Sequence, residues 1–275
     1  MIRMIGEIGS NHNNDWDRTK ELIKQAKLSG FTDVKFQLFD PNRLYKSLDY
    51  DTWCLYNNQQ LNKDLIPKIS DYCKQIDIKF GITPFYNEAI DETKNYVDFY
   101  KISSFDIKRR GLIGACLDTK KDFFISCGLA NNKDISNLLD MILLNYSEKQ
   151  KYYFMHCVSK YPCPYNEAAL KRISEIFLIV LKQKKQNIYV GYSDHTKDID
   201  VIRESISLLA QCLEFHFDLD DKEGYESNYN HCWTPKDISE FYAKIEKIDK
   251  IVNSKFQLKE NELLQLADSI TGLRG

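Results

Sequence analysis

The chain has 275 residues, of which 43% are hydrophobic, and its formal net charge is −2 at pH 7. This length can bury a large core, as one large domain or two small ones, while the near-neutral charge gives no basic surface for nucleic acid. No apolar run approaches the roughly 18 residues of a membrane span, and the N-terminal segment carries no cleavage signal. We therefore expect a cytoplasmic protein without membrane or nucleic-acid partners.

The eight cysteines form no close CxxC pair, and most of them lie inside apolar segments. Thiols in such segments usually pack as small hydrophobic groups. A disulfide framework would be unusual in an intracellular chain of this length. We therefore expect reduced, buried cysteines.

Short apolar runs alternate along the chain with longer amphipathic stretches. The runs lack the polar alternation of a half-exposed strand, which is typical of strands buried on both faces. They lie at residues 4–8, 32–36, 78–83, 99–102, 122–126, 152–157, 188–192 and 213–217. The helical stretches that follow them lie at residues 16–29, 61–75, 88–95, 112–117, 135–144, 167–182, 199–209 and 235–252, and a polar insert precedes the second.

Eight strand–helix units in a chain of this length predict a (β/α)8 TIM barrel, an α/β fold with a parallel sheet. A doubly wound open sheet is the main alternative. No Gly-rich or Pro-rich linker interrupts residues 1–252. We therefore expect one catalytic barrel domain over residues 1–255 and a C-terminal helical tail over residues 256–275.

Polar residues recur where the predicted strands end, which is where the active sites of such barrels lie. The seventh and eighth strands each end in a cluster with a histidine, His195 and His216. If these strands are neighbours, the two imidazoles can bind one ion, and imidazole with oxygen ligands suits Mn, Zn, Fe or Co. Each could instead be a core histidine. Asp194 is expected to orient a ligand, and His12 and His231 to lie in mouth loops that reach substrate.

Charged residues also occur inside the apolar strands. Lys35 and Lys101 could face an anion in the barrel mouth, or they could extend to the rim or neutralise a carboxylate. Glu7 and Glu214 could be ion-pair partners or general acid/base groups. Strand-end hydroxyls could complete a phosphate cradle. These hydroxyls belong to Ser104, Ser126, Ser159 and Ser193.

Taken together, these motifs resemble the sialic acid synthase (N-acylneuraminate synthase) family over about residues 1–250. The motifs follow the family's order, and GYSDHT together with the N-terminal EIGxNHN pattern is specific. They are IGEIGSNHN (5–13), VKFQ (34–37), TPF (83–85), KISS (101–104), ISCGL (125–129), HCVSKYPCP (156–164), GYSDHT (191–196) and EFHF (214–217).

The resemblance implies a TIM barrel that condenses phosphoenolpyruvate with an N-acylated hexosamine, similar to N-acetylmannosamine. The products would be a nine-carbon 2-keto sugar acid and phosphate. It implies that His195 and His216 bind a divalent metal, most often Mn²⁺. It assigns catalysis to Glu7, Glu214, Lys35 and Lys101. It assigns substrate binding to Gln37, Thr83, Ser104, Ser126, Ser159, Tyr161 and Ser193, and Glu226 stands where a substrate-contacting Asp is common.

Some residues depart from the family pattern. Phe215 stands where Lys is common, and Ser159 replaces an Asn of some members. The chain ends at Gly275, without the small antifreeze-like domain that follows the barrel in typical bacterial members. We expect sugar specificity to differ at Phe215 and in the loop up to Trp233, and a homodimer is an expectation from the family.

Two other functions remain open from the residues alone. One is another metal-dependent sugar aldolase or isomerase built on the same barrel. The other is a non-catalytic barrel that only binds a ligand.

Overall fold

Eight parallel strands close into a barrel in the protein's structure, a computed structural model that describes residues 2–44 and 47–252. Each strand pairs with its neighbours in sequence, and β8 returns to pair with β1, which excludes the open sheet. The strands are β1 (Arg3–Gly9), β2 (Asp33–Leu38), β3 (Lys79–Pro84), β4 (Phe99–Ile102), β5 (Asp122–Ser126), β6 (Tyr152–His156), β7 (Ile188–Asp194) and β8 (Cys212–His216). The predicted (β/α)8 barrel is therefore confirmed.

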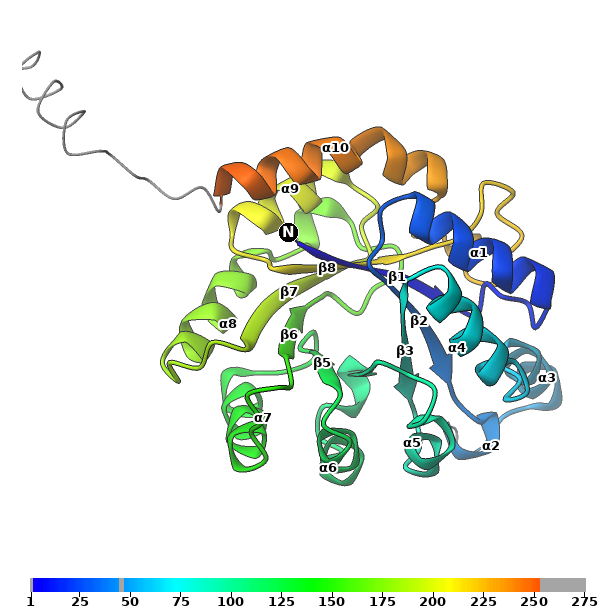
Figure 1. Cartoon of the computed structure of the whole chain (residues 1–275), viewed down its shortest axis with the longest axis horizontal. Helices are drawn as coiled ribbons and strands as arrows, with labels where there is room; N and C mark the ends of the chain where they lie inside the picture. Colours follow the sequence, from blue (N-terminus) through cyan, green and yellow to red (C-terminus); the bar gives the residue numbers. More distant parts are fainter. Residues whose placement is uncertain (1, 45–46, 253–275) are drawn as a thin grey trace, which may run out of the picture.

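Helices surround the barrel on its outside (Figure 1). Those that follow the eight strands are α1 (Trp16–Leu28), α4 (Leu65–Gln75), α5 (Glu88–Thr93), α6 (Arg110–Asp118), α7 (Asn132–Leu144), α8 (Lys171–Leu181), α9 (Ile199–Ser207) and α10 (Pro235–Val252). Three short 3-10 helices are η1 (Ser104–Asp106), η2 (Tyr165–Glu167) and η3 (Ser227–Tyr229). None of the helices in the described part of the chain combines the length and the apolar character that crossing a membrane requires.

The polar insert after β2 contains two helices that the sequence did not predict, α2 (Pro41–Leu44) and α3 (Tyr50–Gln59). The helix α3 buries none of its side chains, so it has no apolar face that periodicity could detect. Its start is set by Asp49, whose side chain accepts a hydrogen bond from the Thr52 N–H at 2.9 Å. The predicted boundary at residue 255 and the tail at 256–275 lie outside the described residues.

The helix α1 shows how local sequence builds the outer layer. The Asp15 side chain caps its start by accepting the Arg18 N–H at 2.6 Å. Its buried residues Leu22, Ile23 and Ala26 have helical spacing and join the core between helices and strands. This packing fixes where the loop between β1 and α1 begins and ends.

A second, smaller core fills the inside of the barrel and forms the floor of its open end. Beneath it the Arg3 guanidinium contacts Asp33 at 3.0 Å and Asp122 at 2.6 Å, and it lies 4.8 Å from the centre of the Phe124 ring. The inner core therefore closes the barrel below the carboxyl ends of its strands. The inner core consists of Ile5, Phe99, Phe124, Tyr153, Met155 and Cys212.

The cysteines are unpaired, and seven of the eight are buried. The exception is Cys54 on α3, which is only partly buried because that helix packs loosely on the surface. The expectation of buried thiols is thus confirmed for the strand and core positions.

Replacing Arg3 with Met should destabilise the fold, because the Asp33 side chain is fully buried and would lose its cation. Removal of one partner from a buried pair costs about 3–5 kcal/mol. The measurement is the free energy of unfolding by denaturant. The double variant Arg3→Met/Asp33→Asn should recover part of the loss, and a single variant as stable as wild type would contradict this role for Arg3.

Candidate active site

A cavity of about 860 Å³ opens at the carboxyl ends of the strands. The residues that the family resemblance assigned to metal binding, catalysis or substrate binding all contribute to its wall, although they come from every strand end of the barrel. They are Glu7, Lys35, Gln37, Thr83, Lys101, Ser104, Ser126, Ser159, Tyr161, Ser193, His195, Glu214, His216 and Glu226.

The first of two buried ion pairs joins Glu7 on β1 to Lys35 on β2. The strand register places the two residues opposite each other. The Lys35 ammonium also donates to the Thr83 hydroxyl at 2.8 Å, and the Gln37 amide donates to Glu7 at 2.8 Å. Hydrogen bonds thus hold both charges of the pair in place.

The second pair joins Lys101 on β4 to Glu214 on β8, across the barrel. The Ser193 hydroxyl on β7 donates to the same carboxylate at 2.9 Å. Both lysines therefore pair with carboxylates, which is one of the alternatives that the sequence left open for them. They also line the cavity, so an anion that enters it meets both of them.

The two carboxyl groups have opposite pKa shifts. Burial raises the pKa of Glu7, and the nearby Lys35 only partly opposes this. Burial also acts to raise the pKa of Glu214, but Lys101 and Lys35 outweigh it and lower that pKa to about 2. Glu214 therefore stays ionised at neutral pH, and Glu7 is the carboxyl group suited to carry a proton.

The two histidines predicted to bind a metal face each other, with ring centres 5.3 Å apart. The His195 Nδ1–H donates to the Val158 carbonyl at 2.5 Å, and the His216 Nδ1–H donates to Glu226 at 2.7 Å. These bonds leave the Nε2 atom of each ring as the lone-pair nitrogen. Burial lowers the pKa of His216 to about 4 and that of His195 well below its usual range, so both rings are neutral.

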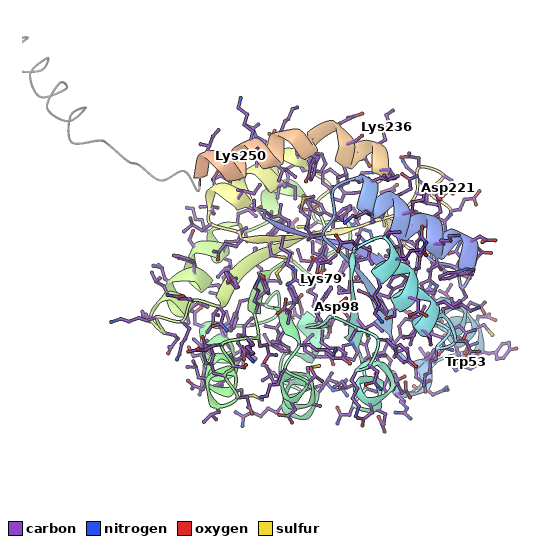
Figure 2. All side chains as sticks on the ribbon, in the orientation of Figure 1. Trp53, Lys79, Asp98, Asp221, Lys236 and Lys250 are labelled. Atoms are coloured by element: carbon purple, nitrogen blue, oxygen red, sulfur yellow. The ribbon has the colours of Figure 1, made fainter. Side chains whose placement is uncertain are left out.

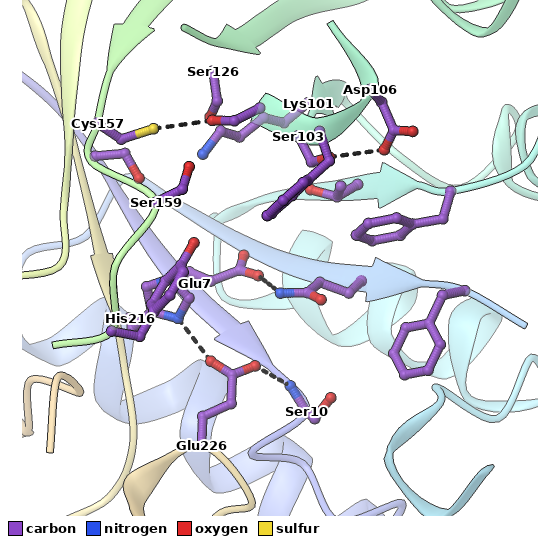
Figure 3. A pocket seen from close by; sticks show the side chains of 18 of the residues that line it. Glu7, Ser10, Lys101, Ser103, Asp106, Ser126, Cys157, Ser159, His216 and Glu226 are labelled. Atoms are coloured by element: carbon purple, nitrogen blue, oxygen red, sulfur yellow. Dashed lines mark hydrogen bonds and ion pairs between the residues drawn. The ribbon is translucent and has the colours of Figure 1, made fainter. Parts of the chain in front are cut away.

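Glu226 lies between His216 and the loop after β1 (Figure 3). One carboxylate oxygen accepts the His216 Nδ1–H, and the other accepts the Ser10 backbone N–H at 2.8 Å. Gly9 permits this approach, because its φ is +53° and a Cβ there would lie 1.8 Å from the Glu226 oxygen. Glu226 thus contacts a candidate metal ligand, in addition to lining the cavity.

His231 joins this group from the same loop. It is 2% exposed, and its ring centre lies 4.5 Å from that of His216. Potential ligand atoms of His216, Glu226 and His231 all lie within 4.8 Å of one another. The sequence placed His231 in a mouth loop but did not indicate that it joins the other histidines.

The loop that carries Glu226 is fastened to the loop after β1. The Asn11 side chain accepts the Glu226 N–H at 2.7 Å and donates to the Phe217 carbonyl at 3.0 Å. The buried Asp218 pairs with Arg18 and also accepts the Gly224 N–H at 2.9 Å. The mouth is therefore pre-ordered on this side.

Asp194 does not contact His195, contrary to the expectation that it orients a metal ligand. Its carboxylate accepts the Trp233 indole N–H at 2.8 Å and the backbone N–H groups of Thr196 and Lys197 at 3.0 and 2.9 Å. It fixes the turn that follows His195, while the Val158 carbonyl orients the ring itself.

Phe215 faces away from the cavity, so of the region expected to set sugar specificity only the loop up to Trp233 contributes to the cavity wall, through Glu226, Tyr229 and His231. Its neighbours Glu214 and His216 line the cavity, and alternation along a strand sends the residue between them outward. There its ring packs against Phe31 and Trp233, with ring centres 5.7 and 5.6 Å away. His12 is also fully buried and does not line the cavity, so it is not placed to contact substrate.

The outer wall of the cavity contains residues that the sequence did not single out. Four of them lie on α2 and α3, the two helices of the insert that the sequence did not predict. They are Arg43, Leu44, Tyr56 and Gln59. Aromatic side chains add to the rim. They are Phe39, Phe85, Phe105 and Tyr229.

Replacing Asp218 with Asn should loosen the loop after β8, because Arg18 loses a partner that is completely buried. We expect amide hydrogen exchange in residues 219–230 to accelerate about tenfold or more. Asp221→Asn is the matched control, since Asp221 pairs with the same Arg18 but is 40% exposed and lies at the outer edge of the molecule (Figure 2). Equal exchange in the two variants would contradict the anchoring role of Asp218.

Comparison with known proteins identifies similar chains. The model of the NeuB family matches residues 22–257. The uncharacterized protein MJ1065 of Methanocaldococcus jannaschii is 31% identical over 91% of this chain and 72% of its own length. The N,N'-diacetyllegionaminic acid synthase of Campylobacter jejuni is 29% identical over 90% of this chain and 76% of its own. The N-acetylneuraminate-9-phosphate synthase of Drosophila melanogaster is 26% identical over 81% and 61%.

Among solved structures, the N-acetylneuraminic acid synthetase of Leptospira borgpetersenii superposes with a TM-score of 0.86. The match covers 100% of this chain and 93% of that one at 24% sequence identity. At this identity the superposition establishes the shared barrel fold alone.

Proposed function

This chain belongs to the NeuB family, and we propose that it is a phosphoenolpyruvate-dependent sugar acid synthase. In the proposed reaction, C3 of phosphoenolpyruvate bonds to the aldehyde carbon of an N-acylated hexosamine similar to N-acetylmannosamine. One water is consumed, and the products are a nine-carbon 2-keto sugar acid and inorganic phosphate. The observation that carries the proposal is the cavity in which two buried lysines lie beside a pair of facing histidines.

We assign the phosphate and carboxylate of phosphoenolpyruvate to Lys35 and Lys101. Both ammonium groups are buried and line the cavity, so their hydrogen bonds to an anion are charge-assisted and poorly screened by water. Strand-end hydroxyls complete the cradle, and the Ser159 hydroxyl is buried without a hydrogen-bond partner. The hydroxyls assigned to this ligand are those of Thr83, Ser104, Ser126, Ser159 and Ser193.

We assign the proton transfers to Glu7. Its pKa is already raised, and a phosphate bound at Lys35 would raise it further by like-charge repulsion. In its ionised form the same carboxylate can take a proton from the water that adds at C2 before the C–O bond to phosphate breaks. Glu214 remains ionised and keeps Lys101 and Ser193 oriented toward the ligand.

The residues present fit a divalent ion, which we propose to be Mn²⁺ held by His195 and His216. Both rings are neutral, and both have an acceptor on Nδ1 that fixes the ring and leaves Nε2 for the ion. When bound, the ion would supply Lewis-acid polarisation of the sugar aldehyde. The carboxylate of Glu226 holds His216 in the required orientation.

We assign the sugar to the outer part of the cavity, beside Gln37 and Tyr161. The Tyr161 ring covers the His195 ring with centres 4.1 Å apart, so a sugar at this position lies next to the proposed metal. The aromatic rim, which includes Phe39 and Phe105, offers apolar contact for an acyl group. The acceptors to compare are N-acetylmannosamine and a 2,4-diacetamido trideoxyhexose, since relatives are named as synthases of N,N'-diacetyllegionaminic acid and of N-acetylneuraminate 9-phosphate.

Phosphate release should require phosphoenolpyruvate, an acylated aldose and Mn²⁺ together. A chelator should abolish it, and added Mn²⁺ should restore it. The measurement is inorganic phosphate across a sugar panel. Turnover without phosphoenolpyruvate would support the sugar aldolase or isomerase instead, and calorimetry that detects neither Mn²⁺ nor phosphoenolpyruvate would support a non-catalytic barrel.

Glu7→Gln should lower kcat by about 10²–10⁴, the usual contribution of a general acid/base group. The Kd for phosphoenolpyruvate should not rise, because Lys35 and Lys101 remain and Lys35 loses a carboxylate that competes with the ligand. Glu223→Gln, in the exposed part of the loop after β8, is the control and should keep wild-type kcat. Wild-type turnover by Glu7→Gln would exclude Glu7 from the proton transfers.

A further inference from the structure

We propose that His231 is a third imidazole ligand of the metal ion, so that the loop after β8 completes the metal site. This inference rests on the metal dependence in the proposed function and extends it to a residue outside the strand-end motifs. The ion would then have His195, His216 and His231 as nitrogen donors, while the Glu226 carboxylate holds the His216 ring through its Nδ1–H.

The first support is geometric. His231 offers a ring nitrogen within 4.8 Å of potential ligand atoms of His216 and Glu226. Its ring centre lies 6.5 Å from that of His195. Ligand atoms of one ion must converge at such separations, since metal–nitrogen and metal–oxygen bonds are about 2.0–2.2 Å long.

The second support is the lack of any other role for the imidazole. Both ring nitrogens of His231 are buried without a hydrogen-bond partner among the described residues, and a Glu226 carboxylate oxygen lies 3.9 Å from Nε2, beyond hydrogen-bond distance. Leaving a buried polar group unpaired destabilises a fold. The core histidine His156, by contrast, bonds the Ala168 carbonyl at 2.8 Å. A bound cation would satisfy a His231 nitrogen that the protein leaves unpaired.

The third support is the surroundings of the ring. The imidazole is 2% exposed, and its centre lies 4.5 Å from that of the candidate ligand His216. The Tyr161 ring lies edge-on above the His231 ring, with centres 5.1 Å apart, and shields it from solvent. The Asn11 and Asp218 bonds described above hold the first part of the loop in place.

This arrangement has a consequence for metal choice. Three imidazoles favour Mn²⁺, Fe²⁺, Co²⁺ or Zn²⁺ over Mg²⁺, which prefers oxygen ligands and retains its waters. With three protein donors, the ion would keep open positions for the sugar. The loop after β8 would therefore influence both metal affinity and the way the aldehyde is presented.

The test is Mn²⁺ binding to the metal-stripped full chain, without phosphoenolpyruvate or sugar, by calorimetry and pulsed electron paramagnetic resonance. His231→Phe keeps a ring of similar shape but removes both nitrogens. We expect its Kd for Mn²⁺ to rise about tenfold or more, and the number of imidazoles coupled to the ion to fall by one. The unfolding midpoint of the metal-free variant should equal or exceed that of wild type, because no hydrogen bond is lost.

The matched control is His12→Phe. His12 is also a buried histidine with an unpaired nitrogen, but it lies outside the cavity. Its Kd for Mn²⁺ should stay at the wild-type value. An unchanged Kd or imidazole count in His231→Phe, or an equal loss in His12→Phe, would overturn the proposal.

Because the assay contains no substrate, its outcome is separate from that of the phosphate-release assay. Loss of an imidazole in His231→Phe together with absent synthase turnover would keep the metal site and reject the proposed reaction. Synthase turnover by the wild-type chain with unchanged Mn²⁺ binding in His231→Phe would keep the proposed reaction and reject His231 as a metal ligand.

Discussion

The interaction on which this site depends is the layer of opposite charges buried in the barrel, where Glu7 meets Lys35 and Glu214 meets Lys101. Desolvating ions is costly, so such a layer persists only with close pairing and further hydrogen bonds. The strand register brings Glu7 and Lys35 close together, and the side chains of Thr83, Gln37 and Ser193 supply the further hydrogen bonds. The apolar core beneath keeps water from entering the layer from below.

This charge layer gives the two glutamates different protonation behaviour. Glu214 has two lysines acting on it and stays ionised, while burial dominates at Glu7. One position thus supplies a fixed negative charge and the other a carboxyl group that can gain or lose a proton. An incoming anion competes with both for the lysines, which couples ligand binding to the protonation of Glu7.

The histidine side of the cavity depends on loops instead of strand register. Glu226 approaches His216 only because Gly9 has no side chain and Asn11 holds the Glu226 backbone. Anchoring of this kind places ligands before any ion binds, which reduces the ordering cost of binding. The same loop brings the unpaired His231 to the group.

Sequence by itself determined the barrel and most of the site. Doubly buried strands appear as continuous apolar runs, and side chains at their carboxyl ends must converge once the sheet closes, so residues as distant as Lys35 and His195 could be assigned to one cavity. It missed α3, because a helix without a buried face carries no periodic signal. Only the tertiary structure decided which charges pair and that Glu226 and His231 join His216. These contacts join residues far apart in the chain, such as Lys101 and Glu214, 113 positions apart, and they depend on register and loop geometry that no local pattern encodes.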